Sequence, residues 1–276
     1  SAAQLPAFVR RLDEALQRNR DLLPDRSLLL ALSRRSVELT TTTRESYSRV
    51  GNTRFGGEPD LPRGFAYPMD GDVAFVFLAQ IDLAEIAEYQ DYLPRTGLLS
   101  FFASDLEYVQ EARVLYHPAE TQLERCPFPE DAIFDRDEPF EGFHARAVQA
   151  WSLPPTYLDL VRIAKGERTD EEAAADDQLY DAYERLRETC CPQRPAQEND
   201  AHGINVYVIT QLDSPEQEAA EKAGGEPGDW KVLLSLGFDK NTEFCFWDAG
   251  TLSFMIRRED LAACRFSRVV AFIESS

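Results

Sequence analysis

RTGLLSFF at Arg95–Phe102 and DAGTLSFM at Asp248–Met255 are nearly the same stretch of sequence, present twice in one chain. Each has a glycine, one further residue, a leucine and then Ser-Phe, a pattern typical of a turn glycine that leads into a strand. Each also follows a short apolar run of strand length, VAFVFLAQI at Val73–Ile81 and VLLSLGF at Val232–Phe238. A strand–turn–strand unit that occurs twice predicts an internally duplicated, mostly antiparallel β core.

The two copies differ where a duplicated active site would need them to agree. Alignment on the glycines places Arg95 opposite Asp248, and alignment of the preceding runs places Gln80 opposite the apolar Leu236. The shared residues are Gly, Leu, Ser and Phe, which form a turn and fill a core. We therefore interpret the repeat as scaffold and expect any function to lie in what the copies do not share.

Segments outside the repeat predict helices around this core. Residues 3–24 have apolar side chains at helical spacing and predict an amphipathic helix, with a second short helix at Ser27–Arg34. Glu167–Glu188 carries nine acidic residues and a narrow apolar stripe, which is typical of an acidic surface helix. These patterns predict the α+β class, with N-terminal helices and an acidic helix on the outside of the β core.

The whole chain is predicted to form one domain. Residues 1–49 are expected to be a helical segment packed on the core, and residues 50–276 the α+β domain itself. Residues 118–166 are rich in proline and acidic side chains, and we expect them to be loop-rich and only partly β. We expect a strand at Ile204–Leu212 and a loop at residues 213–229.

The net charge of −20 is concentrated in the middle of the chain. Residues 51–227 carry 14 basic and 36 acidic side chains, whereas the segments before and after them carry net charges of +3 and −1. Such a field repels nucleic acid and anionic membranes and attracts a basic protein partner. Solubility alone is the alternative explanation. The charge therefore predicts no nucleic-acid or membrane partner, and it leaves the oligomeric state open.

The sequence carries no membrane or secretion signal that we recognise. The longest aliphatic run, Leu28–Leu32, is far too short for a membrane span, and no apolar stretch follows Arg10 and Arg11. The five cysteines have no metal-like spacing. These features predict a cytoplasmic protein with reduced thiols.

Familiar catalytic signatures are missing from the sequence. It has no GxGxxG, Walker A, HExxH, GxSxG or CxxC pattern. The three histidines, His117, His144 and His202, are too scattered to propose a metal site from their spacing. We expect neither a metal nor a cofactor, and a non-enzymatic role is better supported than catalysis.

Four residues are candidates for a small-ligand site. Gln80 lies inside an apolar run, where a buried amide must find hydrogen-bond partners. Asp248 begins the second turn directly after Trp247, and His202 precedes a predicted strand. If the two β units pack together, these side chains would line a cleft between them. The structural alternatives are an aspartate that caps its own turn and a glutamine that pins a loop.

A series of motifs resembles a known family. In chain order they are FGGEPDLP at Phe55–Pro62, YP at Tyr67–Pro68, FLAQIDL at Phe77–Leu83, LPRTGLLSFF at Leu93–Phe102, WDAGTLSFMIRREDL at Trp247–Leu261 and FSRVVAFIES at Phe266–Ser275. Together they resemble the bacterial YwqG-like family, whose function is unknown. The resemblance implies a compact α+β protein with repeated β elements, and it supplies no activity or cofactor. The chain departs from the family pattern at Val206 and Val208, which stand where a Gly and a Pro are usual.

Two functional hypotheses remain open at this point. The favoured one is a non-enzymatic protein, such as an immunity or antitoxin-like factor, that engages a basic partner through its acidic middle region. Its candidate partner-binding residues are Asp170, Glu171, Glu172, Asp176 and Asp177. The alternative is a small-ligand binder or an unrecognised enzyme that uses Gln80, His202, Trp247 and Asp248.

Overall fold

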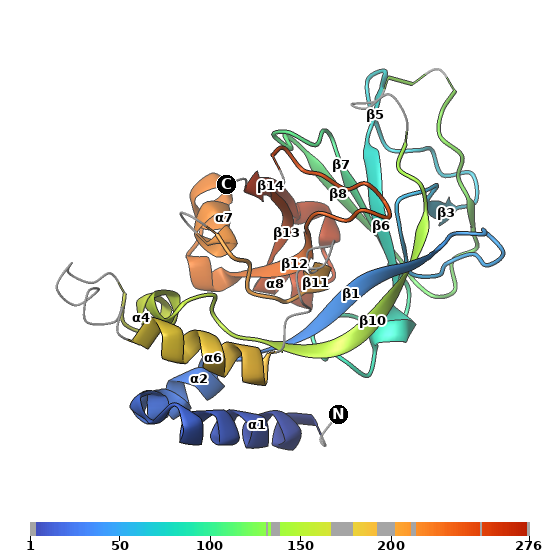
Figure 1. Ribbon diagram of the computed structural model, residues 1–276. Helices are drawn as coiled ribbons and strands as arrows, with labels where there is room; N and C mark the ends of the chain where they lie inside the picture. Colours follow the sequence, from blue (N-terminus) through green and yellow to red (C-terminus); the bar gives the residue numbers. More distant parts are fainter. Residues whose placement is uncertain are drawn as a thin grey trace.

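The computed structural model describes residues 4–130, 132–133, 139–166, 179–191, 202–210, 214–248 and 250–274 (Figure 1). Its largest element is a ten-stranded antiparallel sheet. The strands of this sheet are β1 (Arg34–Arg44), β2 (Arg54–Phe55), β6 (Val76–Asp82), β7 (Leu98–Ala103), β8 (Ala112–His117), β10 (Phe143–Ser152), β11 (His202–Ile204), β12 (Trp230–Leu236), β13 (Thr251–Arg257) and β14 (Val270–Glu274). Two small sheets pair β3 (Asp60–Pro62) with β9 (Leu123–Arg125), and β4 (Met69–Asp70) with β5 (Val73–Ala74).

Helices gather mainly at one side of the sheet (Figure 1). The α-helices are α1 (Gln4–Arg18), α2 (Arg26–Leu32), α3 (Leu83–Ile86), α4 (Tyr157–Lys165), α6 (Tyr180–Cys190), α7 (Pro215–Ala223) and α8 (Arg258–Ala262). The predicted α+β class, with N-terminal helices and a mostly antiparallel core, is confirmed. Within the described ranges, none of the helices is both long enough and apolar enough to cross a membrane.

The order of the strands shows the duplication directly. It runs β8-β7-β6-β2-β10-β1-β11-β12-β13-β14, so each end of the sheet is a three-stranded meander beside a short strand. In chain order, the first half contains β1, β2 and the meander β6–β8, and the second contains β10, β11 and the meander β12–β14. The two long strands, β1 and β10, are exchanged between the halves. β1 of the first half pairs with β11 of the second, and β10 of the second half pairs with β2 of the first. Since β1 and β10 also pair with each other, the halves are interlocked.

A β-bulge at the same place in each half fixes how the copies correspond. The register of β6 and β7 shifts at Leu78, and the register of β12 and β13 shifts at Leu233. Counted from these bulges, Gln80 corresponds to Ser235. The sequence alignment of Gln80 with Leu236 is therefore wrong by one residue, which in a strand moves a side chain to the opposite face.

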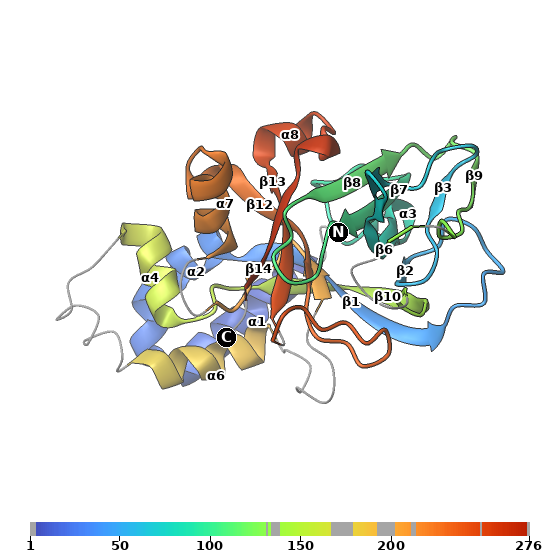
Figure 2. The same ribbon diagram turned by 90° about the horizontal axis from the view of Figure 1, so that it is seen from above.

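The main hydrophobic core lies between the two halves. The sheet curls until its ends lie side by side (Figures 1 and 2), and Phe101 and Phe254, the phenylalanines of the two Ser-Phe motifs, meet with ring centroids 5.2 Å apart. Tyr116 and Phe266 make a second contact across the halves at 5.5 Å. Burying each large apolar side chain contributes about 1.5–3 kcal/mol. The repeated motif thus joins the halves through its own phenylalanines.

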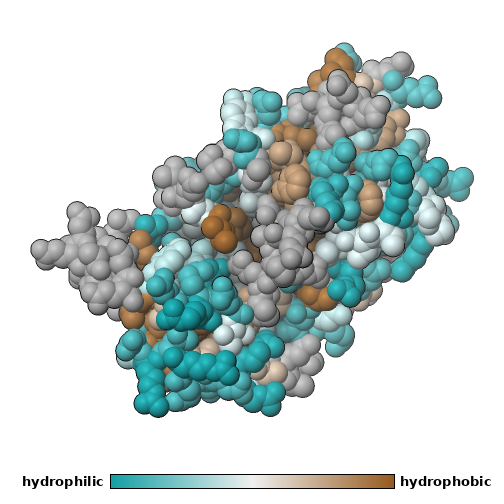
Figure 3. Space-filling view, in the orientation of Figure 1, coloured by the Kyte–Doolittle hydropathy of each residue, from teal (hydrophilic) through white to brown (hydrophobic). Residues whose placement is uncertain are grey.

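A second, smaller core belongs to the helices α1, α2, α4 and α6. Phe8 of α1 stacks on Trp151 of β10 at 4.3 Å, and Tyr183 and Leu186 of α6 are fully buried beside them. The lower edge of the molecule, where α1 lies, is largely hydrophilic in Figure 3. Residues 1–49 supply the central strand β1 as well as helices. The acidic helix expected at Glu167–Glu188 falls partly outside the described residues, and its last part forms α6.

Three sequence-based expectations are corrected by the structure. Residues 118–166, expected to be loop-rich and partly β, contain the ten-residue strand β10 and also the helix α4, which was not expected. Residues 213–229, expected to be a loop, contain α7, which begins with a capping box between Ser214 and Gln217. The strand expected at Ile204–Leu212 ends at Ile204, because the next residue, Asn205, has a φ of 54°.

Candidate interaction site

Two loops, one from each half, meet to expose a pair of aromatic rings. Residues 104–111 connect β7 to β8, and residues 237–248 follow β12. The Trp247 backbone N–H donates to the Leu106 carbonyl at 3.1 Å, and the rings of Trp247 and Tyr108 lie edge to face with centroids 4.9 Å apart. Tyr108 is 66% exposed and Trp247 is 45% exposed. Large aromatic side chains that pair on the surface and stay exposed to solvent are typical of interaction surfaces.

Asp105 shapes the first of these loops. The backbone N–H groups of residues 107–110 donate to its carboxylate at distances between 2.6 and 3.2 Å, and the Ser104 hydroxyl donates at 2.8 Å. Burial alone would raise the pKa of Asp105, but these hydrogen bonds outweigh it and lower the pKa. The loop that carries Tyr108 is therefore built around one ionised carboxylate.

Replacing Asp105 by alanine is expected to destabilise the protein by about 2 kcal/mol, because several backbone donors lose their acceptor. The contribution of a carboxylate with a lowered pKa is complete above about pH 4 and is lost as the pH falls below it. Urea denaturation and amide hydrogen exchange at residues 107–110 measure both effects. Glu107→Ala, an exposed acid in the same loop, is the control, and equal costs for the two variants would contradict this role of Asp105.

His202 and Asp239 anchor the second loop. The Gly237 N–H donates to His202 Nδ1 at 3.1 Å, and His202 Nε2 lies 3.1 Å from Asp239 Oδ2. An amide N–H can only donate, so Nδ1 accepts, and the Nε2–H group donates a hydrogen bond to the Asp239 carboxylate. Both ring nitrogens of the buried His202 are thus occupied. The imidazole positions the loop and is not free to act as a base or a metal ligand.

Asp239 also ties this loop to the central strand of the sheet. The Thr41 hydroxyl of β1 donates to its carboxylate at 2.6 Å, and the N–H groups of Asn241 and Thr242 donate at 2.8 and 3.1 Å. Burial works to raise the pKa of Asp239, but hydrogen bonds from His202, Thr41 and Thr242 together hold it below its usual value. The buried carboxylate therefore stays ionised and fully hydrogen-bonded at neutral pH.

The backbone is strained at Trp247 and at Val109, the residue after Tyr108. Val109 has a φ of 43° and Trp247 a φ of 50°, both in the left-handed region that non-glycine residues rarely adopt. For a β-branched residue such as Val109, this conformation costs of order 1–3 kcal/mol and persists only where the surroundings enforce it. The Val109 N–H donates to the Asp105 carboxylate at 2.8 Å, and the Trp247 N–H donates to the Leu106 carbonyl at 3.1 Å, so each residue is held by a hydrogen bond within the two loops. Strain of this kind concentrates at functional sites.

The two loops that carry the rings expose more acidic than basic side chains, and the one exposed base among their described residues is Lys240. Glu107 and Glu111 lie on the first loop, Glu243 and Asp248 on the second, and all four are exposed. Glu111 also forms an ion pair with Arg113 at 3.7 Å. An aromatic pair flanked by carboxylates is a favourable place for a lysine or arginine side chain, which stacks on the ring face while its charge meets the acids.

Three of the four ligand-site candidates belong to this loop system. Trp247 and Asp248 lie on its surface, and His202 lies beneath it. Sequence reasoning missed Tyr108, Asp105 and Asp239, although SDLEY and FDKNT both contain the Asp, Asn, Ser or Thr residues that are typical of turns. The candidate partner residues Asp170, Glu171, Glu172, Asp176 and Asp177 lie outside the described residues.

Gln80 is separated from the others by the sheet itself. Arg54 and Phe55 are consecutive residues of β2, so their side chains point to opposite faces. Gln80 is the cross-strand neighbour of Arg54, whereas the His202 ring lies 5.0 Å from the Phe55 ring. The structure does not bring Gln80 to His202 or Trp247. The space between the halves, where a shared cleft was expected, is occupied by the main core.

Gln80 belongs instead to a buried polar network around Arg54. The Arg54 guanidinium lies 2.8 Å from Asp60 Oδ1 and 4.0 Å from Glu45 Oε2, and all three side chains are almost completely buried. The Gln80 amide donates to Asp60 Oδ2 at 2.8 Å and to the Asn52 carbonyl at 2.9 Å. This network fixes the path of the FGGEPDLP segment.

Comparison with known proteins identifies the family but no activity. A family model for a domain of unknown function, DUF1963, matches residues 53–274. The match runs from just before β2 to the end of β14 and leaves α1, α2 and β1 outside it. No curated protein matches the chain. No group of three His, Cys, Asp or Glu side chains suited to hold a metal ion occurs in the described part of the chain.

Proposed function

The chain belongs to the DUF1963 family of unknown function, and we propose that it is a non-enzymatic protein that binds a basic protein partner. The observation that carries this proposal is the exposed Tyr108–Trp247 pair. The carboxylates of Asp105 and Asp239 accept hydrogen bonds from the backbone of the two loops that carry these rings. Tyrosine and tryptophan are enriched among the residues that dominate binding energy at protein interfaces. An exposed aromatic pair with acids on the same two loops suits a partner that presents arginine or lysine.

The charge of the whole chain supports the same partner chemistry. A net charge of −20 steers a cationic protein toward the surface over a distance of roughly a Debye length, about 8 Å at physiological salt. Such steering raises the rate of association, while the aromatic contacts slow dissociation. Association should therefore weaken steeply as salt is added. An immunity or antitoxin-like role in the cytoplasm, and the YwqG-like assignment within the family, are finer parts of this proposal.

Trp247→Ala tests the proposal because it changes no charge. Pull-downs from the native host at low salt, followed by titration of the recovered basic protein, should show binding at least about thirtyfold weaker than wild type, which corresponds to about 2 kcal/mol. Adsorption driven by net charge alone would be unchanged in this variant. The matched control is Phe65→Ala, because Phe65 is also 45% exposed but lies on another loop of the first half.

Two outcomes would contradict the proposal. One is the recovery of no basic protein by the wild-type chain at low salt. The other is equal binding by the Trp247→Ala and Phe65→Ala variants, which would show that the aromatic pair is not the contact. The exposed acids supply a further check. Glu107→Gln combined with Asp248→Asn should flatten the salt dependence of binding without changing the stability of the fold.

A further inference from the structure

Lys231 stands where the other copy of the duplicated scaffold has an apolar residue. Counted from the two β-bulges, Lys231 of β12 corresponds to Val76 of β6, which is 4% exposed and belongs to the main core. Lys231 pairs with Ile256 of β13, a residue of the same core, so its side chain leaves the sheet on the core face. Only four of the 29 basic residues of the chain are lysines. Lysine, unlike arginine, loses its proton readily when it is buried.

The Lys231 amine lies between groups from both halves. Its Nζ donates to Asn205 Oδ1 at 3.4 Å and lies 5.0 Å from the ring centroid of Tyr92. Tyr92 belongs to the loop that follows α3 in the first half, whereas Asn205 directly follows β11 in the second. In the described part of the chain no carboxylate forms an ion pair with Lys231, and Asp91, whose charge reaches it, pairs with Arg35 at 3.7 Å. The amine is therefore held without a counter-ion.

The Tyr92 hydroxyl beside this amine is buried and makes no hydrogen bond within the described structure. The Asn205 amide group, which lies close to it, donates to the Arg35 carbonyl at 2.9 Å. Burial and then the Asp91 charge raise the pKa of Tyr92, against smaller opposing effects of Arg35 and Asn205, so the phenol keeps its proton. Buried polar groups in native proteins nearly always have a partner. An acceptor attached to Lys231 would supply one.

Positive charge near Lys231 favours the loss of its proton. The pKa of Lys231 is lowered to about 8, first by burial and then by the guanidinium groups of Arg258 and Arg34, while Asp91 acts in the opposite direction. Arg34 is itself paired with Glu216 at 2.7 Å. At pH 7 roughly a tenth of such an amine is unprotonated, against less than about a thousandth of an ordinary lysine. The unprotonated amine is the nucleophilic form, and the same positive field favours a group that becomes negative at this position.

We propose that Lys231 reacts reversibly with carbon dioxide to form a carbamate. The lone pair of the neutral Nζ forms a bond to the carbon of CO2, one C=O π bond opens onto its oxygen, and a proton leaves Nζ for solvent. The amine and CO2 thus give the carbamate anion and one proton, with no change of oxidation state. The Tyr92 hydroxyl donates to a carbamate oxygen, the remaining N–H donates to Asn205 Oδ1, and the Arg258 guanidinium offsets the new negative charge.

The position suits so small a reactant. Lys231 is only partly buried, and the adduct adds just a carbon and two oxygens to its side chain. Because Tyr92 belongs to the first half and Lys231 to the second, the carbamate adds a polar link between them. Lys231 lies near the start of β12, whereas the loop that carries Trp247 follows the end of this strand. The modification is therefore independent of the Tyr108–Trp247 surface and of the function proposed for it.

The probe is carbon-13-labelled CO2 in equilibrium with bicarbonate, added to the full chain at pH 8, where about half of the Lys231 amine is unprotonated. A carbamate signal should appear in the carbon-13 NMR spectrum. Trapping the adduct as an ester with an alkylating oxonium ion, followed by peptide mass spectrometry, should place it on Lys231 and separate it from any adduct of the N-terminal amine. Lys231→Arg keeps the positive charge but should lose this adduct.

Tyr92→Phe tests the role of the unpaired hydroxyl. It should lower the carbamate occupancy of Lys231 by about fivefold at a fixed concentration of CO2, because the adduct loses one hydrogen bond. Its melting temperature without CO2 should be equal to or higher than that of wild type, because the removed hydroxyl has no partner in the described structure.

The control is Lys222, whose side chain is 56% exposed and pairs with Glu218 at 2.6 Å. It should carry at least about tenfold less carbamate than Lys231, because the Glu218 carboxylate repels a second negative charge. Lys222→Arg should leave the signal at Lys231 unchanged. Absence of a carbamate at Lys231, equal labelling of Lys231 and Lys222, or unchanged occupancy in Tyr92→Phe would each overturn the proposal.

Discussion

Replacement of Arg54 by methionine is expected to lower the free energy of unfolding by about 4 kcal/mol. Arg54 is 0% exposed, and its guanidinium donates to the Glu58 carbonyl and pairs with the Asp60 carboxylate at 2.8 Å. Methionine fills a similar volume but donates no hydrogen bond. The variant therefore leaves Asp60 and Glu45 buried without their cation, and an unpaired buried charge costs far more than the pair contributes.

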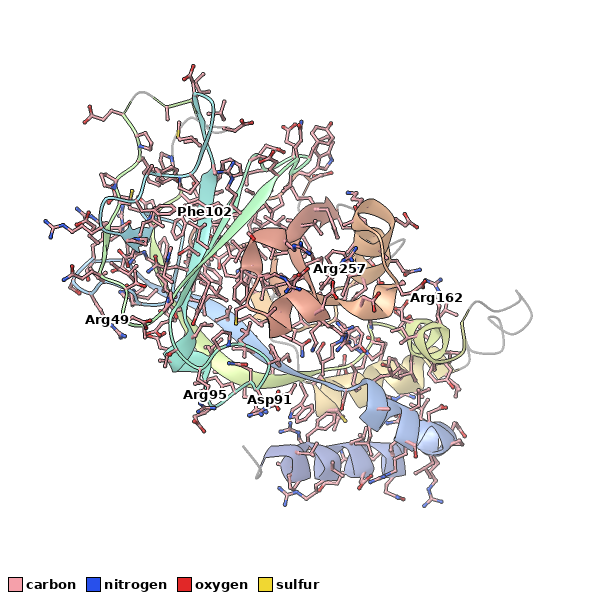
Figure 4. All side chains as sticks on the ribbon, turned by 180° about the vertical axis from the view of Figure 1, so that it is seen from behind. Arg49, Asp91, Arg95, Phe102, Arg162 and Arg257 are labelled. Carbon is pink, nitrogen blue, oxygen red and sulfur yellow. The ribbon has the colours of Figure 1, made fainter. Side chains whose placement is uncertain are left out.

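Urea denaturation of wild type and variant measures this cost, and Arg49→Met is the matched control. Arg49 lies at the margin of the molecule (Figure 4), its side chain is 62% exposed, and it pairs with Asp82 at 3.1 Å and Glu85 at 3.4 Å. Exposed ion pairs contribute about 0–1 kcal/mol, so Arg49→Met should change stability by less than this. Similar costs for the two variants would show that burial does not decide the strength of the Arg54 network.

A second substitution separates the unpaired charge from the lost packing. Asp60→Asn in the Arg54→Met background removes the carboxylate that the first change leaves without a cation. The double variant is expected to be more stable than Arg54→Met alone, by about 1–2 kcal/mol, because residues of one network are not additive. If the double variant were less stable than Arg54→Met, the cost would come from lost hydrogen bonds to Asp60 and not from its charge.

The sequence predicted those parts of the fold that depend on local pattern. The repeated Gly-x-Leu-Ser-Phe motif identified both meanders, because a turn glycine and an apolar run lie next to each other in the chain. The exchange of β1 and β10 could not be read in this way, since pairing between strands about a hundred residues apart leaves no local signal. The bounds of β10 were not predicted within residues 118–166, which were expected only to be partly β, because small residues such as Ala145 and Ala147 give a weak alternation. α7 was missed although Ser214 followed by Gln217 is the sequence pattern of a capping box.

The candidate site was predicted only in part, and for similar reasons. Trp247 and Asp248 were selected because they stand at a turn, and His202 because it precedes a predicted strand; all three belong to one loop system. Tyr108 was not selected, because its importance arises from a contact with Trp247 that crosses between the halves. Gln80 was selected correctly as a buried amide that needs partners, but its partners are Asp60 and Asn52 on the other face of the sheet.

Asp239→Asn is expected to destabilise the protein by about 3 kcal/mol at neutral pH. The wild-type carboxylate accepts hydrogen bonds from His202, Thr41 and two backbone N–H groups. An amide in its place has no charge to strengthen these bonds, and its N–H₂ group would face donors. Asp248→Asn is the matched control, because it makes the same change of charge at an exposed position of the same loop. It should alter stability by less than about 0.5 kcal/mol.

The pH dependence of the Asp239→Asn effect follows from the direction of the pKa shift. The pKa of Asp239 is lower in the folded than in the unfolded chain, so its contribution is fully present above about pH 4. It is lost as the pH falls toward the folded-state pKa, where the wild-type carboxylate is protonated as well. The difference in unfolding free energy between wild type and Asp239→Asn should therefore narrow in acid, whereas the Asp248→Asn difference should stay small throughout.

The same variant links the buried network to the exposed aromatic pair. If Asp239 holds the loop that enforces the positive φ of Trp247, then Asp239→Asn should accelerate hydrogen exchange at residues 241–247 and weaken partner binding, although no surface residue changes. Asp248→Asn should weaken binding only through its charge, and so only at low salt. Unchanged exchange in Asp239→Asn would mean that the strain at Trp247 is supported by its contact with Leu106 and Tyr108 alone. That result would also contradict a positioning role for His202, because His202 contacts the loop through the Asp239 carboxylate and the Gly237 N–H.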